Sequence, residues 1–268
     1  MKIGIIGYGK MGQLFNRLFE KEGYDVMIND LKIKSISFKK LIKDSDYIMI
    51  SASHDSNKKI INKLAKMSNN GNLNNKLIFD ISTFKKELIN YYNKFSSNVL
   101  LSSVHPLFGS GIKDPKKHYI AIIPISKNDG SKLVENLFSN IGFNTFYVDY
   151  KTHDEIIALT IGLSYIIGLS VNRILSFYDK NMVEKLSGTT FKYLKNHYLS
   201  ILNDSSDFAN YILKQQEVKD ILKNYRKVLL ELLNNKKRIS TLNKIYLNYS
   251  EKEIKSAYDK MYRCIESY

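Results

Sequence analysis

Cysteine and long apolar segments are both scarce in this chain. Its 268 residues contain one cysteine, Cys264, which excludes a disulfide framework and a cluster of thiolate metal ligands. The amino terminus enters an apolar segment at residues 2–6 without a basic leader or a small-residue cleavage site, so we expect a cytoplasmic protein. The longest uncharged apolar stretch, residues 156–172, is shorter than the roughly 20 residues that cross a bilayer. We expect it to form a helix buried in protein, with no membrane association.

Positive charge is in excess, but no block of the sequence concentrates it. The net charge is +15, and the lysines are scattered along the chain, which is typical of a solvated surface. We find no internal repeat and no low-complexity tail. The pattern argues against a nucleic-acid partner and favours a positive field that attracts anionic cofactors and carboxylate substrates.

The first 150 residues alternate short apolar runs with helical patterns, which indicates parallel β-α-β units. After the first run, apolar residues at positions 11, 14, 15, 18 and 19 follow the spacing of one helix face. A Gly-rich turn therefore lies between a strand and a helix. We expect strands at residues 2–6, 25–29, 47–51, 77–81, 99–104, 119–125 and 145–148.

After about residue 152 glycine turns become rare and long helical patterns continue to the end. Residues 153–178 are expected to form one helix that is apolar on nearly every side, and we expect a second subunit to cover part of it. The sequence thus predicts an α/β domain over residues 1–150 and an all-helical domain over residues 151–268 that forms a homodimer. We expect further helices at residues 191–202, 208–234 and 250–265.

Residues 7–12, Gly-Tyr-Gly-Lys-Met-Gly, match the Gly-x-Gly-x-x-Gly fingerprint of dinucleotide binding. The first glycine permits a tight turn, the second lets the backbone approach a pyrophosphate, and the third lets helix and strand pack closely. The phosphates would then lie at a helix amino terminus. The alternative is a glycine turn that serves packing alone. The residues expected to bind the cofactor are Gly7, Tyr8, Gly9, Lys10, Met11, Gly12 and Asp30.

Asp30 is expected at the end of the second strand, where a carboxylate can accept hydrogen bonds from the ribose hydroxyls of the adenosine. Its charge would repel a 2'-phosphate, which favours NAD over NADP. Lys32 and Lys34 follow closely and weaken that preference, so NADP stays possible.

Residues 101–111 place His105 between a strand-like apolar run and a turn. An imidazole at the carboxyl end of a strand can meet a substrate, although it can also cap the strand end through backbone hydrogen bonds. Of the other histidines, His153 is expected to serve the start of a helix, because His-Asp-Glu resembles a cap and first turn. His54 is expected to lie on the surface.

Residues 105–109, His-Pro-Leu-Phe-Gly, resemble the His-Pro-x-x-Gly element of the prephenate and arogenate (cyclohexadienyl) dehydrogenase family, which carries a catalytic histidine. Residues 80–85, Asp-Ile-Ser-Thr-Phe-Lys, resemble the Asp-x-x-Ser-x-Lys element of that family, with Thr83 at the serine position. Residues 152–154 look like the start of its helical domain, and residues 188–192 resemble a later helix. The resemblance covers most of the chain and implies a Rossmann-type, doubly wound, mostly parallel sheet followed by an all-helical domain.

The resemblance also implies an activity, the NAD-dependent oxidative decarboxylation of prephenate or arogenate in tyrosine biosynthesis. Hydride would pass from the hydroxyl-bearing ring carbon to the nicotinamide while carbon dioxide leaves. His105 would accept a hydrogen bond from the ring hydroxyl, and Thr83 or Ser82 would orient the imidazole or that hydroxyl. Lys85 is expected to bind substrate, or to support the loop at the strand end or the cofactor side.

Two positions depart from the family pattern. Tyr165 stands where the family has a substrate-binding histidine, and Ser200 where it has an arginine for a substrate carboxylate. A dicarboxylate substrate needs cations, and arginine serves best. The choice between prephenate and arogenate therefore stays open. The expected substrate-binding residues are Lys85, Tyr165, Lys192 and His197, with Arg173 and Lys195 as further candidates, and no metal site is expected.

Two other interpretations stay open. One is a different Rossmann dehydrogenase with a helical dimerisation domain, such as a 3-hydroxy acid dehydrogenase or an imine reductase, although neither group is marked by His-Pro-x-x-Gly. The other is a cofactor-binding regulator that has lost catalysis, which the changes at Tyr165 and Ser200 favour. Formation of NADH with a cyclohexadienyl acid separates the leading hypothesis from both.

Overall fold

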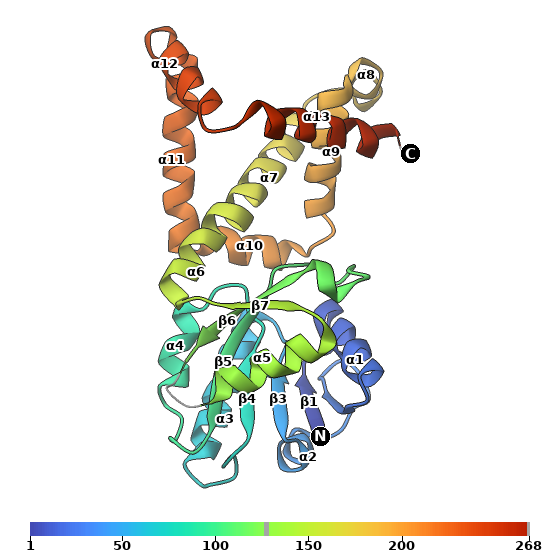
Figure 1. The fold of residues 1–268 in the computed structure, drawn as a ribbon, viewed down its shortest axis with the longest axis vertical. Helices are drawn as coiled ribbons and strands as arrows, with labels where there is room; N and C mark the ends of the chain where they lie inside the picture. The colour runs from blue at the N-terminus through green and yellow to red at the C-terminus, as the bar shows by residue number, and fades with distance from the viewer. Residues whose placement is uncertain (126–128, 267–268) are drawn as a thin grey trace. The chain divides into compact units, whose positions relative to one another are not determined.

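The computed structural model describes residues 1–125 and 129–266. The chain divides into two units, Met1–Asp154 and Glu155–Tyr268. In the described part of the first unit, seven strands form one sheet in the order β2-β1-β3-β4-β5-β6-β7 (Figure 1). Neighbouring strands are parallel except β5 and β6, which run antiparallel. This arrangement confirms the mostly parallel sheet. The strands are β1 (Lys2–Ile6), β2 (Asp25–Asn29), β3 (Tyr47–Ile50), β4 (Leu77–Asp80), β5 (Leu100–Pro106), β6 (Tyr119–Pro124) and β7 (Asn144–Tyr147).

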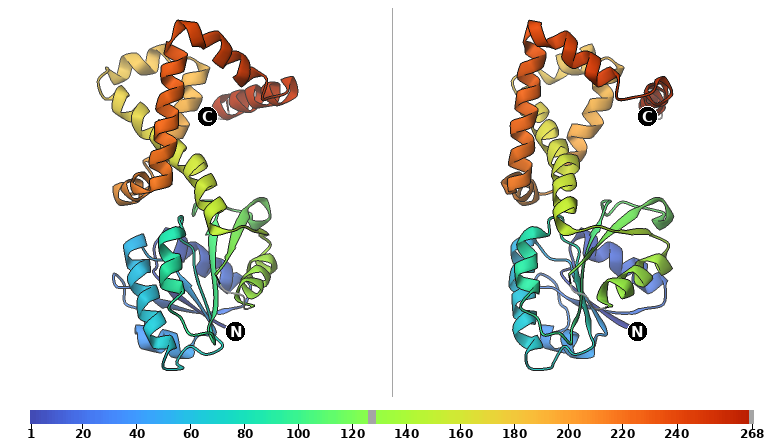
Figure 2. Two further views of the ribbon diagram at one scale, coloured as in Figure 1. Left: turned by 90° about the vertical axis from the view of Figure 1, so that its left-hand side faces the viewer. Right: turned by 60° about the vertical axis from the view of Figure 1, so that its left-hand side comes forward.

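Helices cover both faces of this sheet (Figure 2). Successive side chains of a strand point to opposite faces, so Ile5 of β1 joins a core with α1 and α5, whereas Ile6 joins a core with α2, α3 and α4. Parallel strands buried on both faces account for the continuous apolar runs in the sequence. The helices are α1 (Lys10–Lys21), α2 (Phe38–Asp44), α3 (His54–Ser68), α4 (Lys86–Tyr92) and α5 (Gly130–Ile141), with a short 3₁₀ turn at Pro115–Lys117.

The order of the strands defines where a ligand can bind. β1 pairs with β2 on one side and with β3 on the other, so the connections after β1 and β3 lead away in opposite directions. Ligands of such sheets bind at this reversal, outside the carboxyl ends of the strands. The carboxyl ends of β1, β3, β4 and β5 all lie at this edge because the four strands are parallel.

The second unit contains helices and no strand among its described residues, as predicted. Its helices approach closely where glycine replaces a side chain: a Cβ on Gly168 of α7 would lie 2.4 Å from Ile201 Cδ1 of α9. A Cβ on Gly162 would likewise lie 2.8 Å from Val218 Cγ2 of α11. The chain enters this unit through α6 (Tyr150–Ile157) and a π-helical segment (Ala158–Gly162), followed by α7 (Leu163–Leu175), α8 (Lys180–Leu186), α9 (Thr189–Ile201), α10 (Ser206–Lys214), α11 (Gln216–Leu233), α12 (Asn235–Tyr246) and α13 (Glu251–Glu266).

Two predicted helices need correction. The helix expected at 153–178 begins earlier, at Tyr150, contains the π-helical segment and ends at Leu175. The helix expected at 208–234 is interrupted at Gln215, whose backbone is extended. Ile212 and Val218 are six residues apart and would point to different faces of one continuous helix, and the break allows both to be buried.

The apolar segment is longer than the uncharged stretch suggests. Tyr150–Leu175 is helical over 26 residues, with a mean hydropathy of 1.6 in its most apolar window, which meets the length and composition of a membrane-crossing helix. Core helices of soluble proteins meet the same criteria. Only 39% of that window is buried within the chain. The helix is expected to be buried on every side, and the rest of the chain does not bury it so completely.

Candidate active site

The three glycines of the turn after β1 occupy three different environments. Gly7 has φ +100°, and a Cβ there would lie 2.6 Å from the Ser51 carbonyl oxygen, so only glycine fits. A Cβ on Gly12 would lie 2.3 Å from the Gly7 oxygen, which shows how closely α1 packs on the turn. A Cβ on Gly9 would have no atom within 4 Å among the described residues, so backbone at the start of α1 faces open space. These three environments fit the turn, packing and approach roles that the fingerprint predicts.

Asp30 lies directly after β2, next to the turn. Its Oδ2 accepts a hydrogen bond of 2.7 Å from the Tyr8 N–H, and its Oδ1 accepts one of 2.7 Å from the Lys32 N–H. The N–H groups of Lys32 and Tyr8 hold the pKa of Asp30 below its ordinary value. An ionised carboxylate is thereby tethered to the turn. Lys10 and Met11 open α1 beside it.

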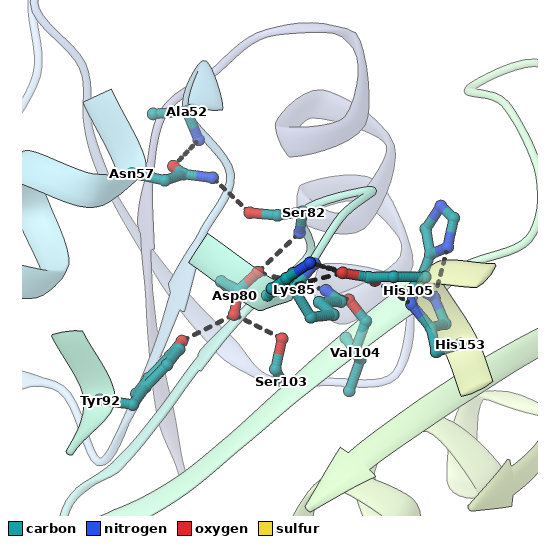
Figure 3. Close-up of polar contacts among 12 residues, drawn as sticks. Ala52, Asn57, Asp80, Ser82, Lys85, Tyr92, Ser103, Val104, His105 and His153 are labelled. Atoms are coloured by element: carbon teal, nitrogen blue, oxygen red, sulfur yellow. Dashed lines mark hydrogen bonds and ion pairs between the residues drawn. The ribbon is translucent and has the colours of Figure 1, made fainter. Parts of the chain in front are cut away.

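His105 lies near the carboxyl end of β5 and is 5% exposed. Its Nδ1 lies 3.0 Å from His153 Nε2, and the two rings are nearly perpendicular, at 77° (Figure 3). The partner of this imidazole is thus a second imidazole, 48 residues further along the chain, and not the backbone of the strand end.

His153 does not serve the start of α6, so that prediction is wrong. The cap is Asp149, whose Oδ1 accepts hydrogen bonds from the N–H groups of Lys151 (3.0 Å) and Thr152 (3.1 Å). With the cap supplied, the buried His153 is directed to His105 on one side and to Asp154 on the other, where its Nδ1 lies 2.8 Å from Oδ1. His153 and Asp154 are the site residues that the sequence interpretation missed.

A buried ion pair lies beneath the end of β5. Lys85 and Asp80 are both 0% exposed, and Lys85 Nζ donates to Asp80 Oδ1 (3.3 Å) and to the Val104 carbonyl (2.7 Å). The other carboxylate oxygen of Asp80 accepts hydrogen bonds from Ser103 Oγ (2.6 Å) and Tyr92 OH (2.7 Å). Lys85 is therefore enclosed in protein: the structure corrects its expected contact with substrate and gives it the supporting role.

The charges around His105 determine its protonation. Burial opposes ionisation of Asp80, but the Lys85 ammonium and the donated hydrogen bonds outweigh it and keep the pKa of Asp80 below its ordinary value. The pKa of His105 lies well below 6.5, first because the ring is buried and then because Lys85 and His153 disfavour a positive charge on it. His105 is therefore a neutral imidazole near pH 7.

Ser82 and Thr83 follow β4 at the same edge. Ser82 Oγ accepts a hydrogen bond from Asn57 Nδ2 (2.8 Å), and Asn57 Oδ1 accepts one from the Ala52 N–H (3.1 Å), which links the ends of β3 and β4. Thr83 is half-buried. In the described structure the imidazole of His105 is oriented by His153 and not by either hydroxyl. Contact of these hydroxyls with a substrate stays a prediction.

The remaining predicted residues lie in the helical unit. Tyr165 of α7 is buried, and its hydroxyl donates to the Asp204 carboxylate. His197 of α9 contacts α7 through Nε2, 3.3 Å from the Ser164 carbonyl oxygen, and Lys192 of α9 is exposed. The structure thus groups Tyr165, Lys192 and His197 on two packed helices and groups Ser82, Thr83, Lys85 and His105 at the edge of the sheet. Within residues 1–125 and 129–266, no cluster of three potential ligands is placed to hold a metal ion.

No protein-family model and no curated protein matches the sequence. Solved structures match the fold. Prephenate dehydrogenase from Aquifex aeolicus, in complex with hydroxyphenyl propionate and NAD+, is similar over 92% of this chain and 96% of its own, with a TM-score of 0.73 and 17% identity. Arogenate dehydrogenase from Synechocystis is similar over 97% and 99%, with a TM-score of 0.69 and 13% identity. The chain therefore has the fold of the prephenate and arogenate dehydrogenases, as its motifs predict.

Proposed function

We propose that this chain is an NAD-dependent dehydrogenase that oxidatively decarboxylates prephenate to 4-hydroxyphenylpyruvate, or arogenate to tyrosine, in cytoplasmic tyrosine biosynthesis. The observation that carries the proposal is a neutral, buried His105 at the same edge of the same sheet as a glycine turn open for a dinucleotide. The fold shared with prephenate and arogenate dehydrogenases supports it.

The turn and Asp30 fit the dinucleotide. The open space at Gly9 leaves room for the pyrophosphate near the N–H groups that begin α1. Glycine has no side chain that could fill this space or accept hydrogen bonds from these groups. Asp30 would accept the ribose hydroxyls and repel a 2'-phosphate, so NAD is the preferred cofactor. When bound, the nicotinamide supplies the hydride acceptor.

His105 would act on the ring hydroxyl of the substrate. A neutral imidazole accepts a hydrogen bond from that hydroxyl and takes up its proton as the carbonyl develops. Lys85 and Asp80 hold the end of β5 from beneath, through the Val104 carbonyl, and so keep His105 in place. Thr83 or Ser82, which follow the neighbouring strand, would contact the same hydroxyl.

The residues predicted to bind the substrate carboxylates belong to the helical unit. Lys192 is exposed and cationic, and His197 and Tyr165 present further polar groups on the packed pair α7 and α9. Asp204 beside Tyr165 adds a negative charge, which would favour a substrate with an ammonium group over one with a keto group. We therefore propose arogenate as a substrate beside prephenate.

The test is an assay of NADH formation with prephenate and with arogenate, each offered NAD and NADP. We expect turnover with at least one acid, a preference for NAD, and loss of turnover in His105→Asn with NAD binding retained. Binding of NAD without oxidation of either acid would contradict the proposal and favour a regulator. Oxidation of a 3-hydroxy acid or an amine instead would favour a different dehydrogenase.

We also propose that the helical unit pairs with a second copy of the chain. Large apolar side chains are exposed there, among them Phe177 (67%), Leu186 (79%) and Leu247 (85%), and buried apolar surface stabilises subunit contacts. Light scattering on the purified chain should give the mass of a dimer, and a monomer at micromolar concentration would contradict this assembly.

A further inference from the structure

A carboxylate and a second imidazole form a row behind His105. Asp154 Oδ1 lies 2.8 Å from His153 Nδ1, and His153 Nε2 lies 3.0 Å from His105 Nδ1. All three side chains are buried, and Figure 3 shows the contact between the ring nitrogens of the two imidazoles as a dashed line. The row ends at His105 Nε2, which makes no hydrogen bond with any residue in the described ranges.

Asp154 fixes the direction of the hydrogen bonds in this row. Its oxygens accept the N–H of Lys85 (3.0 Å to each oxygen) and the N–H of Lys86 (2.8 Å), where α4 begins. A carboxylate has only acceptor sites, so the contact with His153 Nδ1 must be donated by the imidazole. His153 therefore carries its proton on Nδ1.

The position of the proton on His153 determines the position of the proton on His105. Burial lowers the pKa of His153 despite its hydrogen bond to Asp154, so the ring is neutral and has one donor and one acceptor. Because Nδ1 is the donor, Nε2 is the acceptor and must receive a proton from His105 Nδ1. His105 Nε2 is then left with a free lone pair.

We infer that Asp154 and His153 are positioning residues, which hold His105 in the tautomer with its proton on Nδ1 and its lone pair on Nε2. The inference deepens the proposed function and rests on it, since the ring hydroxyl is the group that Nε2 would accept. As the C–H hydride leaves for the cofactor, the hydroxyl proton moves to Nε2 and a carbonyl forms. When the bond to the carboxylate breaks and carbon dioxide leaves, its electron pair makes the ring aromatic, and the proton returns from Nε2 to the oxygen.

The direct test measures the tautomers by ¹⁵N NMR of the histidine-labelled full chain. The chain has five histidines, and the signals lost in His105→Asn assign this residue. Protonated and unprotonated ring nitrogens have well-separated shifts. We expect His105 to have a protonated Nδ1 and an unprotonated Nε2 near pH 7. An unprotonated Nδ1 and a protonated Nε2 on His105 in the wild-type protein would overturn the inference, and this result needs no substitution of His153 or Asp154.

The variant Asp154→Asn tests whether the carboxylate of Asp154 determines the tautomer of His105. The amide oxygen can still accept the N–H groups of α4, whereas the amide nitrogen turned towards His153 is a donor. His153 must then accept at Nδ1 and donate from Nε2, which moves the proton of His105 to Nε2. We expect this reversal in the ¹⁵N spectrum and a loss in kcat of about 10²–10⁴-fold, with NAD affinity unchanged. An unchanged tautomer in a folded variant, or unchanged kcat, contradicts the inference.

Glu87→Gln is the matched control. Glu87 belongs to the same helix α4 and accepts from His54 Nε2 at 2.9 Å, but its carboxylate is half-exposed and the pair does not reach His105. The change should leave both the His105 tautomer and kcat as in the wild type. The two failures are distinguishable: absence of turnover with every cyclohexadienyl acid removes the proposed function, whereas turnover with a reversed tautomer removes the role of Asp154 and His153 alone.

Discussion

Gly9→Ala should weaken binding of NAD without disturbing the fold. A methyl group at this position would meet no atom within 4 Å among the described residues, and the backbone, with φ −71° and ψ −171°, suits any amino acid. The methyl would instead project where the proposed pyrophosphate approaches the start of α1. Charge-assisted hydrogen bonds to backbone N–H groups contribute about 1.5–3 kcal/mol each. Loss of one such bond predicts a Kd for NAD that is roughly ten- to a hundredfold higher.

Stability should hardly change in this variant. Alanine is a poorer N-cap than glycine, by about 0.5–1 kcal/mol, but it restricts the unfolded chain by about 0.4–1 kcal/mol, so the two effects nearly cancel. Gly188 offers a matched control: it is the N-cap of α9, with φ −76° and ψ 175°, and its Cβ would also meet nothing within 4 Å among described residues. Gly188→Ala should have the same effect on unfolding and none on NAD binding.

Gly12→Ala, in contrast to Gly9→Ala, should lower the free energy of unfolding. Its Cβ would lie 2.3 Å from the Gly7 oxygen, a backbone atom that cannot move aside cheaply, and such overpacking costs about 1–3 kcal/mol. Urea unfolding and calorimetric titration with NAD on the three variants measure both effects. If Gly9→Ala binds NAD as the wild type does, the turn is not the pyrophosphate site.

Three further predictions concern charge. Asp30→Ser should reduce the preference for NAD over NADP, because a carboxylate that repels a 2'-phosphate is removed; an unchanged ratio of the two Kd values would contradict this role. Since the pKa of His105 lies below 6.5, log(kcat/KM) should stay level down to pH 6.5 and fall only below it; an acid limb above 6.5 would exclude His105 as the base. Lys85→Met should lower the free energy of unfolding in urea by about 3–5 kcal/mol, because Asp80 stays buried without its cation, and adding Asp80→Asn should restore part of that loss.

The pH dependence of stability follows from the same shift. The unfolded chain takes up protons on its histidines below about pH 6.5, whereas folded His105 and His153 resist protonation until lower pH. The unfolded state therefore binds more protons in that window. The free energy of unfolding should decrease as the pH falls below 6.5.

The sheet can be predicted closely from the sequence, because its central strands, β1 and β3 to β6, are buried on both faces. β1 and β2 begin and end at the expected residues, and β6 differs only at its end. The helical unit is less predictable. α8 and α12 have no buried residue among those described, and their larger apolar side chains, such as Leu186 and Ile239, are exposed.

The glycine turn and His105 can be predicted because each is marked by a local motif, whereas the partner of His105 cannot. His153 lies 48 residues away and reaches the imidazole only through the placement of α6 beside the end of β5. A local cue was nevertheless present: Asp149 already provides an N-cap for α6, so His153 and Asp154 are not needed there.

The supporting role of Lys85 could be predicted from the burial of Asp80, although its sequence motif suggests a different role. A lysine near a candidate active site suggests an anionic ligand, and on that basis it is expected to contact substrate. Asp80, however, ends a central parallel strand, where side chains are buried, and a buried carboxylate requires a cation or several donors. Lys85 is the first cation after that strand and can turn back to it. The position of the acid within the strand therefore determines the role of the lysine, and a charged residue in a buried strand should be paired before its neighbours are assigned to a ligand.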